Sequence, residues 1–155
     1  MNFCDPITYP TVEEAEKIKD KREKWGISLG VHPSHPKAKV DLGKVGKHID
    51  TFVDKGLLTG LGEIGFDWGW AHQNPIKDQE TIVEHIINKA RVDVPVILHV
   101  RGYRDRHSRI AYEHCLEFLK GRLPRQQIIQ LHCFHGNREI MEKWREEFPN
   151  TFYSI

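Results

Sequence analysis

The sequence predicts an α/β fold in which about five parallel strands alternate with helices, as in a partial (β/α)8 TIM barrel. Short continuous apolar runs, typical of buried parallel strands, alternate with segments whose apolar residues recur at helical spacing. Successive apolar runs also end in the same kind of side chain, since Glu63, His99 and His132 follow one another about one strand–helix unit apart. Regular alternation of this kind favours parallel strands joined by right-handed crossovers.

The first elements are set by capping and breaking residues. Residues 1–10 are expected to be irregular because Pro6 and Pro10 interrupt them. Thr11 suits a helix N-cap, and the acidic residues that follow favour a helix to about Trp25. Further strands are expected at 26–31, around Glu63, and at 95–99, 128–132 and 151–155, with helices at 41–55, 76–92, 108–120 and 137–148.

No linker or low-complexity stretch divides the sequence, so residues 1–155 are interpreted as a single domain. Five strands would suffice for a small open sheet, whereas a complete barrel normally takes roughly 250 residues. The sequence stops inside the strand expected at 151–155, which favours a barrel that is incomplete.

Composition restricts the class of protein. Lys and Arg (23) nearly balance Asp and Glu (22), so any attraction for nucleic acid must come from a local basic patch. The three cysteines form no CxxC pair and no even disulfide framework, which is typical of a reducing compartment. Because neither a membrane span nor a signal-peptide apolar region is present, an intracellular protein, cytoplasmic or nuclear, is expected.

The strand-end residues suggest a metal site. In parallel barrels the carboxyl ends of the strands meet at one face and carry the chemistry. Glu63, His99 and His132 would meet there and supply carboxylate and imidazole ligands for a divalent ion. The alternatives are a glutamate bonded to loop amides and two ordinary strand-end histidines.

Four motifs in this order resemble TatD-type metal-dependent deoxyribonucleases. They are Gly-Val-His-Pro at 30–33, Gly-Glu-Ile-Gly-Phe-Asp at 62–67, Pro-Val-Ile-Leu-His-Val-Arg at 95–101 and His-Cys-Phe-His-Gly at 132–136. The resemblance implies a metal-dependent-hydrolase TIM barrel that cleaves phosphodiester bonds of DNA, often from the 3′ end, with one or two Mg²⁺, Mn²⁺ or Zn²⁺ ions. It further implies that Glu63, His99 and His132 bind one metal and that Glu63, the candidate catalytic residue, bridges to a second.

The sequence departs from that family at both ends. The family has a His-x-His pair at the end of its first strand, and none occurs before His32. It also has a late-strand Asp, which would fall beyond Ile155. We therefore expect the central part of a family member, in which some ligands of the second metal are missing.

Candidate substrate-binding residues flank the three ligands. His32 follows a strand and could hold a substrate phosphate, or Pro33 could merely stiffen its loop. Arg101 and Arg104 belong to an arginine-rich run over 101–109 just ahead of a helix, where the dipole prefers anions, so a nucleic-acid backbone is the expected partner. Trp68 could stack unpaired bases or cap the core. Asp67 could orient a ligand from behind or simply form a turn.

The leading hypothesis is a divalent-metal-dependent phosphodiester hydrolase that acts on DNA, with RNA also open. One alternative is a metallo-hydrolase of the same superfold acting on another ester or amide, because a fold does not fix the substrate. Another is a non-catalytic barrel fragment that binds metal or a partner and exposes the edges of its outer strands.

Overall fold

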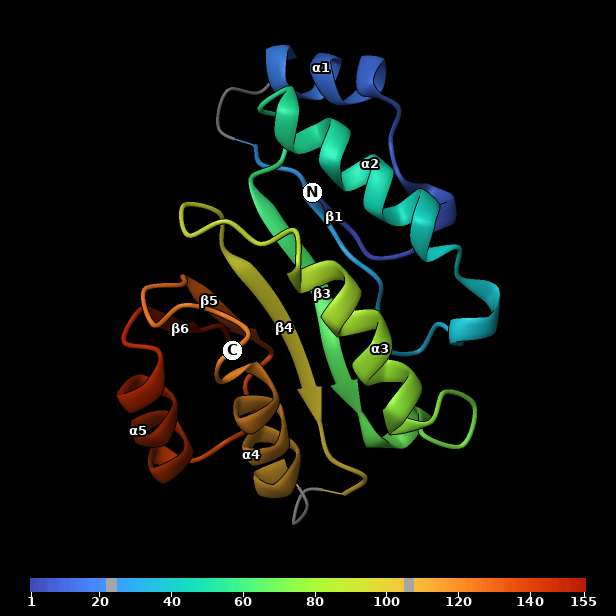
Figure 1. Ribbon diagram of the computed structural model, residues 1–155. Coiled ribbons are helices and arrows are strands. Elements are labelled where there is room, and N and C mark those ends of the chain that lie inside the picture. The colour runs from blue at the N-terminus through green and yellow to red at the C-terminus, as the bar shows by residue number, and fades with distance from the viewer. Residues whose placement is uncertain (22–24, 105–107) are drawn as a thin grey trace.

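Parallel strands form one sheet in the order in which they occur in the chain (Figure 1). The structure is a computed structural model that describes residues 1–155 except 22–24 and 105–107. Within the described residues the sheet has six strands. They are β1 (Asn2–Phe3), β2 (Ser28–Leu29), β3 (Gly60–Asp67), β4 (Val96–Arg101), β5 (Ile129–His132) and β6 (Thr151–Tyr153).

Helices follow the strands and lie together on one face of the sheet (Figure 1). The α-helices are α1 (Val12–Lys21), α2 (Leu42–Asp54), α3 (Ile76–Ile87), α4 (Ser108–Leu119) and α5 (Arg138–Glu147), and the short 3₁₀ turns are η1 (Pro6–Thr8), η2 (Lys37–Lys39) and η3 (Trp68–Trp70). Sequential parallel strands with helices on a single face are the winding of a barrel, not of a doubly wound sheet. The predicted partial barrel is therefore confirmed.

The amino-terminal segment differs from the expectation. Residues 1–10 contain strand β1 and turn η1, and β1 is the sixth strand where five were expected. The Ser28 N–H donates to the Met1 carbonyl and the Gly30 N–H to the Phe3 carbonyl, both at 2.9 Å. A strand of two residues is too short to show an apolar period, so the sequence pattern could not reveal it.

Burial alternates along β4, where Val96, Leu98 and Val100 are buried toward the helices and His99 is half-buried on the opposite face. Successive side chains of a strand point to opposite faces, so Arg101 shares the face of His99. On the neighbouring strand β5, His132 pairs in register with His99. The face without helices therefore carries the polar residues that the sequence singled out.

The glycines beside Glu63 allow β3 and β4 to approach closely. Gly62 and Gly65 have φ angles of +143° and +146°, which L side chains rarely adopt. A Cβ at Gly65 would collide with the carbonyl of His99, and one at Gly62 with the carbonyl of Ile97. Positions 62 and 65, on either side of Glu63, therefore require glycine.

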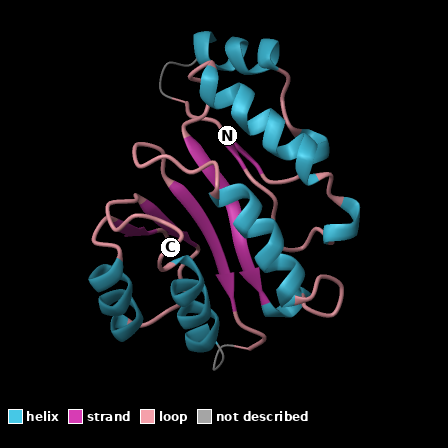
Figure 2. Cartoon of the chain, in the orientation of Figure 1, coloured by secondary structure: helices cyan, strands magenta, loops and turns pink. Residues whose placement is uncertain are grey.

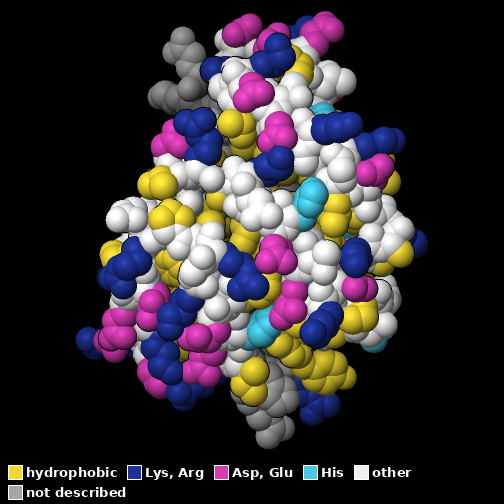
Figure 3. Space-filling model, viewed as in Figure 1, with side chains coloured by type: hydrophobic (Ala, Val, Ile, Leu, Met, Phe, Trp, Pro, Cys, Tyr) yellow, Lys and Arg dark blue, Asp and Glu magenta, His cyan; other side chains and the backbone are white. Residues whose placement is uncertain are grey.

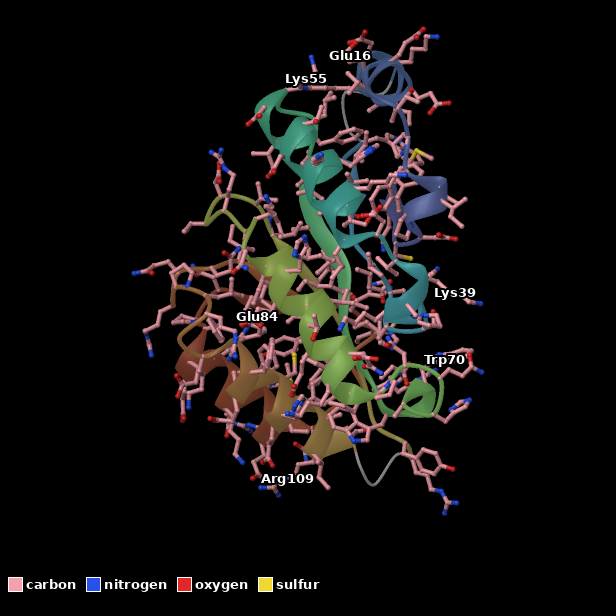
Figure 4. All side chains as sticks on the ribbon, turned by 45° about the vertical axis from the view of Figure 1, so that its right-hand side comes forward. Glu16, Lys39, Lys55, Trp70, Glu84 and Arg109 are labelled. Carbon is pink, nitrogen blue, oxygen red and sulfur yellow. The ribbon has the colours of Figure 1, made fainter. Side chains whose placement is uncertain are left out.

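The two ends of the sheet differ in content. Strands β3 and β4 run to the same edge (Figure 2), and Trp70 and Arg109 lie at that end of the molecule, whereas Glu16 and Lys55 lie at the other (Figure 4). Over the helical face, Lys and Arg side chains are interspersed with Asp and Glu (Figure 3). That face offers no field of one sign to a nucleic acid, so the carboxyl edge of the strands is where binding groups must be sought.

No described helix combines the length and the apolar character that crossing a membrane would require.

Candidate metal centre

Three side chains from successive strands converge at the carboxyl edge of the sheet. His32 follows β2, Glu63 lies within β3 and His99 lies within β4. One ligand-type atom from each residue lies within 4.8 Å of those of the other two. Glu63 is 8% exposed, and His32 and His99 are half-buried with their rings edge to face at 4.4 Å. Donors of this type, this close together, suit a divalent ion.

His99 lies between two carboxylates. Its Nδ1 is 3.1 Å from Glu63 Oε1, and its Nε2 is 2.9 Å from Asp67 Oδ2. A metal-bound histidine typically donates its second ring N–H to a carboxylate, which fixes the tautomer and the ring orientation. Asp67 is the residue in that position, and Nδ1, which faces Glu63, is left as the ligating nitrogen.

The charges in this group stabilise one another. Burial lowers the pKa of His99, but hydrogen bonds to Asp67 and Glu63 outweigh it and raise the pKa above its ordinary value of 6.5. Burial raises the pKa of Glu63, but the hydrogen bond from His99 and the charges of His99 and His132 bring it below the ordinary value of 4.5. Glu63 is therefore ionised near neutral pH, and the two carboxylates favour the protonated form of His99 in the metal-free protein.

Asp67 is fully buried, and both of its carboxylate oxygens accept hydrogen bonds. Its Oδ2 accepts from Arg101 Nη2 at 2.8 Å as well as from His99, and its Oδ1 accepts from the Gly69 N–H at 2.9 Å. Burial raises the pKa of Asp67, but the hydrogen bonds from His99 and Arg101 outweigh it and lower the pKa. Asp67 thus lies where a residue that orients His99 would be, and its role in orienting a ligand stays a prediction.

Two buried amides tie Asp67 to the loop of His32. Gln79 of α3 accepts the Asp67 N–H at 2.8 Å and donates to the carbonyls of Asp67 (3.0 Å) and Asn74 (2.8 Å). Asn74 donates in turn to the carbonyls of Pro33 (2.9 Å) and His35 (3.1 Å). Both side chains are at most 1% exposed. These bonds join the end of β3, the start of α3 and the loop after β2 into one unit.

The tautomer of His32 follows from its neighbours. The Ser34 N–H donates to His32 Nδ1 at 3.1 Å, so the ring proton of the neutral form is on Nε2. Burial, followed by the charge of His99, lowers the pKa of His32 to about 4, so the ring is neutral near pH 7. A neutral histidine with its proton on Nε2 is a hydrogen-bond donor toward the site.

His132 lies beside His99 in the sheet but outside the close cluster of described ligand atoms. Its Nδ1 is 3.4 Å from Ser154 Oγ, which also accepts the Cys133 N–H at 3.2 Å. Cys133 has a φ of +48°, unusual for a residue other than glycine, and turns the chain sharply after β5. The structure therefore brings Glu63 and His99 together as expected and places His32, rather than His132, third in the close cluster.

The proposed substrate-binding residues lie on the same edge. Arg101 is about half-exposed and is held by Asp67, while Arg104 is exposed in the loop after β4. Trp68 is half-buried, packs against the core and meets the His114 ring edge to face at 5.1 Å. Arg106, part of the same arginine-rich run, falls outside the described residues.

Sequence reasoning missed three contributors. Gln79 and Asn74 were not among the predicted site residues, yet their buried amides fix the backbone around Asp67 and the loop of His32. Asn2 of the unexpected strand β1 places its Nδ2 at 3.4 Å from Glu63 Oε2. The available signal was the glutamine itself, because a polar residue on an apolar helix stripe must find buried partners.

Residues 3–155 match the model of the family described as TatD related DNase. Among curated proteins, the chain is 26% identical over 158 residues to the 3′-5′ RNA nuclease TATDN2 of Homo sapiens, covering 96% of this chain and 18% of that protein. It is 27% identical over 118 residues to the 3′-5′ ssDNA/RNA exonuclease TatD of Erwinia tasmaniensis, covering 76% of this chain and 41% of that protein. The chain thus spans at most half the length of the curated relatives it matches.

Two solved structures share the fold. The hydrolase TatD family protein from Entamoeba histolytica superposes with a TM-score of 0.72 over 99% of this chain and 49% of that one, at 17% sequence identity. An amidohydrolase from Saccharomyces cerevisiae superposes with a TM-score of 0.66 over 94% of this chain and 54% of that one, at 15% identity. At these identities the superpositions show the fold alone.

Proposed function

The chain belongs to the TatD related DNase family, and on that premise we propose that it serves divalent-metal-dependent hydrolysis of phosphodiester bonds in nucleic acid, proceeding from the 3′ end. The observation that carries the proposal is the arrangement Glu63–His99–Asp67. A ligand carboxylate faces one ring nitrogen of His99, and a fully buried carboxylate holds the other. Two of the relatives are 3′-5′ nucleases, one of RNA and one of single-stranded DNA and RNA, which supports the direction and the substrate class.

We assign the metal to Glu63, His99 and His132. The Nε2 proton of His32 would have to leave before that nitrogen could bind an ion, and the Ser34 N–H occupies Nδ1. His132 pairs with His99 in register, and its one described side-chain hydrogen bond is long, at 3.4 Å. When bound, Mg²⁺, Mn²⁺ or Zn²⁺ would polarise a phosphoryl oxygen and lower the pKa of the attacking water.

The remaining residues bind and orient the substrate. His32 donates from Nε2 to a non-bridging phosphate oxygen, and Arg101 presents the guanidinium N–H groups that Asp67 does not use. Arg104 adds a second guanidinium along the same edge. Among the described residues, Oε2 of Glu63 accepts only a long hydrogen bond from Asn2 Nδ2, at 3.4 Å. This oxygen is therefore available to accept a proton from the attacking water.

The test is cleavage of 3′- and 5′-end-labelled single-stranded DNA and RNA with Mn²⁺, Mg²⁺ or Zn²⁺. We expect stepwise shortening from the 3′ end that EDTA abolishes. The matched control is Glu63→Gln, which keeps the shape of the side chain and removes its charge. Cleavage that persists in Glu63→Gln would show that the activity arises elsewhere.

Measuring metal binding and the hydrolysis of a carboxylic ester beside this cleavage assay separates the alternatives. Metal binding without cleavage of either nucleic acid would indicate the non-catalytic fragment. Metal-dependent hydrolysis of a carboxylic ester, with both nucleic acids left intact, would indicate a different hydrolase of this superfold.

A further inference from the structure

A cavity of about 350 Å³ opens beside the candidate metal centre. Its described walls come from four places along the chain: Gly69 in η3, the end of β4 with residues 102–104, the start of α4 at Ser108, and His135 after β5. Arg101 lines the cavity and also bonds Asp67 at 2.8 Å, and Asp67 bonds His99 at 2.9 Å. Two polar contacts therefore connect the cavity to the metal centre.

The polar side chains among the described lining residues are cationic or neutral. Arg101 and Arg104 contribute guanidinium groups, Ser108 a hydroxyl and His135 an imidazole, and no carboxylate occurs among the described lining residues. Asp67, which bonds Arg101, is fully buried beneath the described part of this lining. Such a lining suits a phosphate group, because guanidinium forms charge-assisted hydrogen bonds to phosphate oxygens.

The cavity also presents an aromatic ring. Tyr103 is 62% exposed, and the Arg104 guanidinium carbon lies 5.6 Å from its ring centroid. Trp68, the aromatic residue that the sequence suggested for stacking, is half-buried and packed against His114. An exposed aromatic ring in a cationic cavity offers a face on which a nucleobase can stack.

We propose that this cavity binds one nucleotide of the substrate, with its base stacked on Tyr103 and its phosphate on Arg101 and Arg104. The proposal rests on the proposed function and adds to it a binding site for the nucleotide next to the cleaved bond. A volume of 350 Å³ is at the small end of ligand pockets and suits a single unstacked unit, not a duplex. Because every base has a π-face, the site accepts any base.

The test measures binding in EDTA, where no cleavage intervenes. Fluorescence anisotropy compares labelled oligo-dT with an oligomer of equal length made of abasic sites, using the wild type, Tyr103→Ala and Tyr103→Phe. We expect Tyr103→Ala to weaken oligo-dT binding about fivefold or more, Tyr103→Phe to bind as the wild type does, and all three to bind the abasic oligomer alike.

A matched control uses Trp25→Ala, because Trp25 is 48% exposed and precedes β2 at the opposite edge of the sheet. It should leave oligo-dT binding unchanged. Equal oligo-dT affinity in the wild type and Tyr103→Ala, or an equal loss on the abasic oligomer, would overturn base stacking at Tyr103. If base stacking is overturned but the wild type still cleaves DNA in a metal-dependent way, the proposed function stands and only the role of this cavity is lost. If the wild type does not cleave nucleic acid at all, the proposed function itself is overturned.

Discussion

Two buried glutamines show how the opposite edges of this sheet differ. Gln79 and Gln127 are each 1% exposed, and each side chain bonds several backbone groups. Gln127 precedes β5 at the amino edge and donates to the carbonyls of Arg91 (3.0 Å), Val94 (2.9 Å) and Ile128 (3.2 Å). Gln79, at the carboxyl edge, bonds the backbone of Asp67 and Asn74 instead. The same kind of side-chain-to-backbone bonding fixes a loop in one place and the candidate metal centre in the other.

Burial and hydrogen bonding alone do not distinguish a residue that supports a functional site from one that only stabilises the fold. In parallel barrels the amino edge contributes stability and the carboxyl edge carries the chemistry. Gln127 leaves its Oε1 without a described partner, whereas Gln79 uses both ends of its amide. A residue's place in the topology therefore decides whether its bonds stabilise the fold alone or also position side chains that react.

The largest effect is expected from the histidines of the carboxyl edge. We expect His132→Asn to weaken Mn²⁺ binding more than about 100-fold, since loss of an orienting partner alone costs 10- to 100-fold. His32→Asn should leave Mn²⁺ binding within a few-fold and raise the KM for DNA. Isothermal titration with Mn²⁺ and steady-state kinetics measure the two. Loss of metal affinity in His32→Asn, with His132→Asn unaffected, would make His32 the third ligand.

Paired substitutions test the two glutamines directly. Gln79→Leu and Gln127→Leu should each lower the free energy of unfolding by about 2–4 kcal/mol, because backbone groups lose buried partners. Only Gln79→Leu should also weaken Mn²⁺ binding, by about 10-fold, because Asp67 then holds His99 less firmly. Urea unfolding and Mn²⁺ titration give the two quantities. Equal Mn²⁺ affinity in both variants would reduce Gln79 to a structural residue.

The smallest effect is a pH dependence of the metal-free protein. The folded protein binds the His99 proton more tightly than the unfolded chain, since its pKa lies above 6.5. The resulting stabilisation is fully present below about pH 6.5 and is lost as the pH rises through the folded-state pKa.

The Tm in EDTA should therefore fall as the pH rises above about 6.5, and His99→Gln should flatten that slope. The pKa of His32 is lowered to about 4, so His32 affects the pH dependence of stability only below about pH 6.5 and not the slope above it. If the Tm of His99→Gln fell as steeply above pH 6.5 as that of the wild type, the pH dependence would not come from His99.

Most of the fold was predictable because the spacing of apolar residues distinguishes its helices from its buried strands. The helices after each strand were expected within a few residues of their observed limits; for example, 41–55 was expected and Leu42–Asp54 is observed. The sequence could not reveal β1, which consists of Asn2 and Phe3 and exists only through its pairing with β2. Pairing is a tertiary property that leaves no local pattern.

The site was predictable where it coincides with strand ends and not where it depends on long-range hydrogen bonds. Glu63 and His99 end apolar runs, and the structure brings them within 3.1 Å. Asn74 reaches back to Pro33 and His35 across about 40 positions of the sequence, a contact that no spacing rule encodes. Whether Arg101, Arg104 and Trp68 bind substrate stays a prediction.

The consecutive order of the strands has a consequence for how the chain acquires its structure. Each strand pairs with the strand made just before it, so a growing polypeptide always finds its next partner already in place. Domains fold as synthesis proceeds from the amino terminus, and this sheet can be extended one strand–helix unit at a time without rearranging earlier units. Glu63 and His99 would therefore meet while β5 and β6 were still being synthesised, and His132 would join a pair that had already formed.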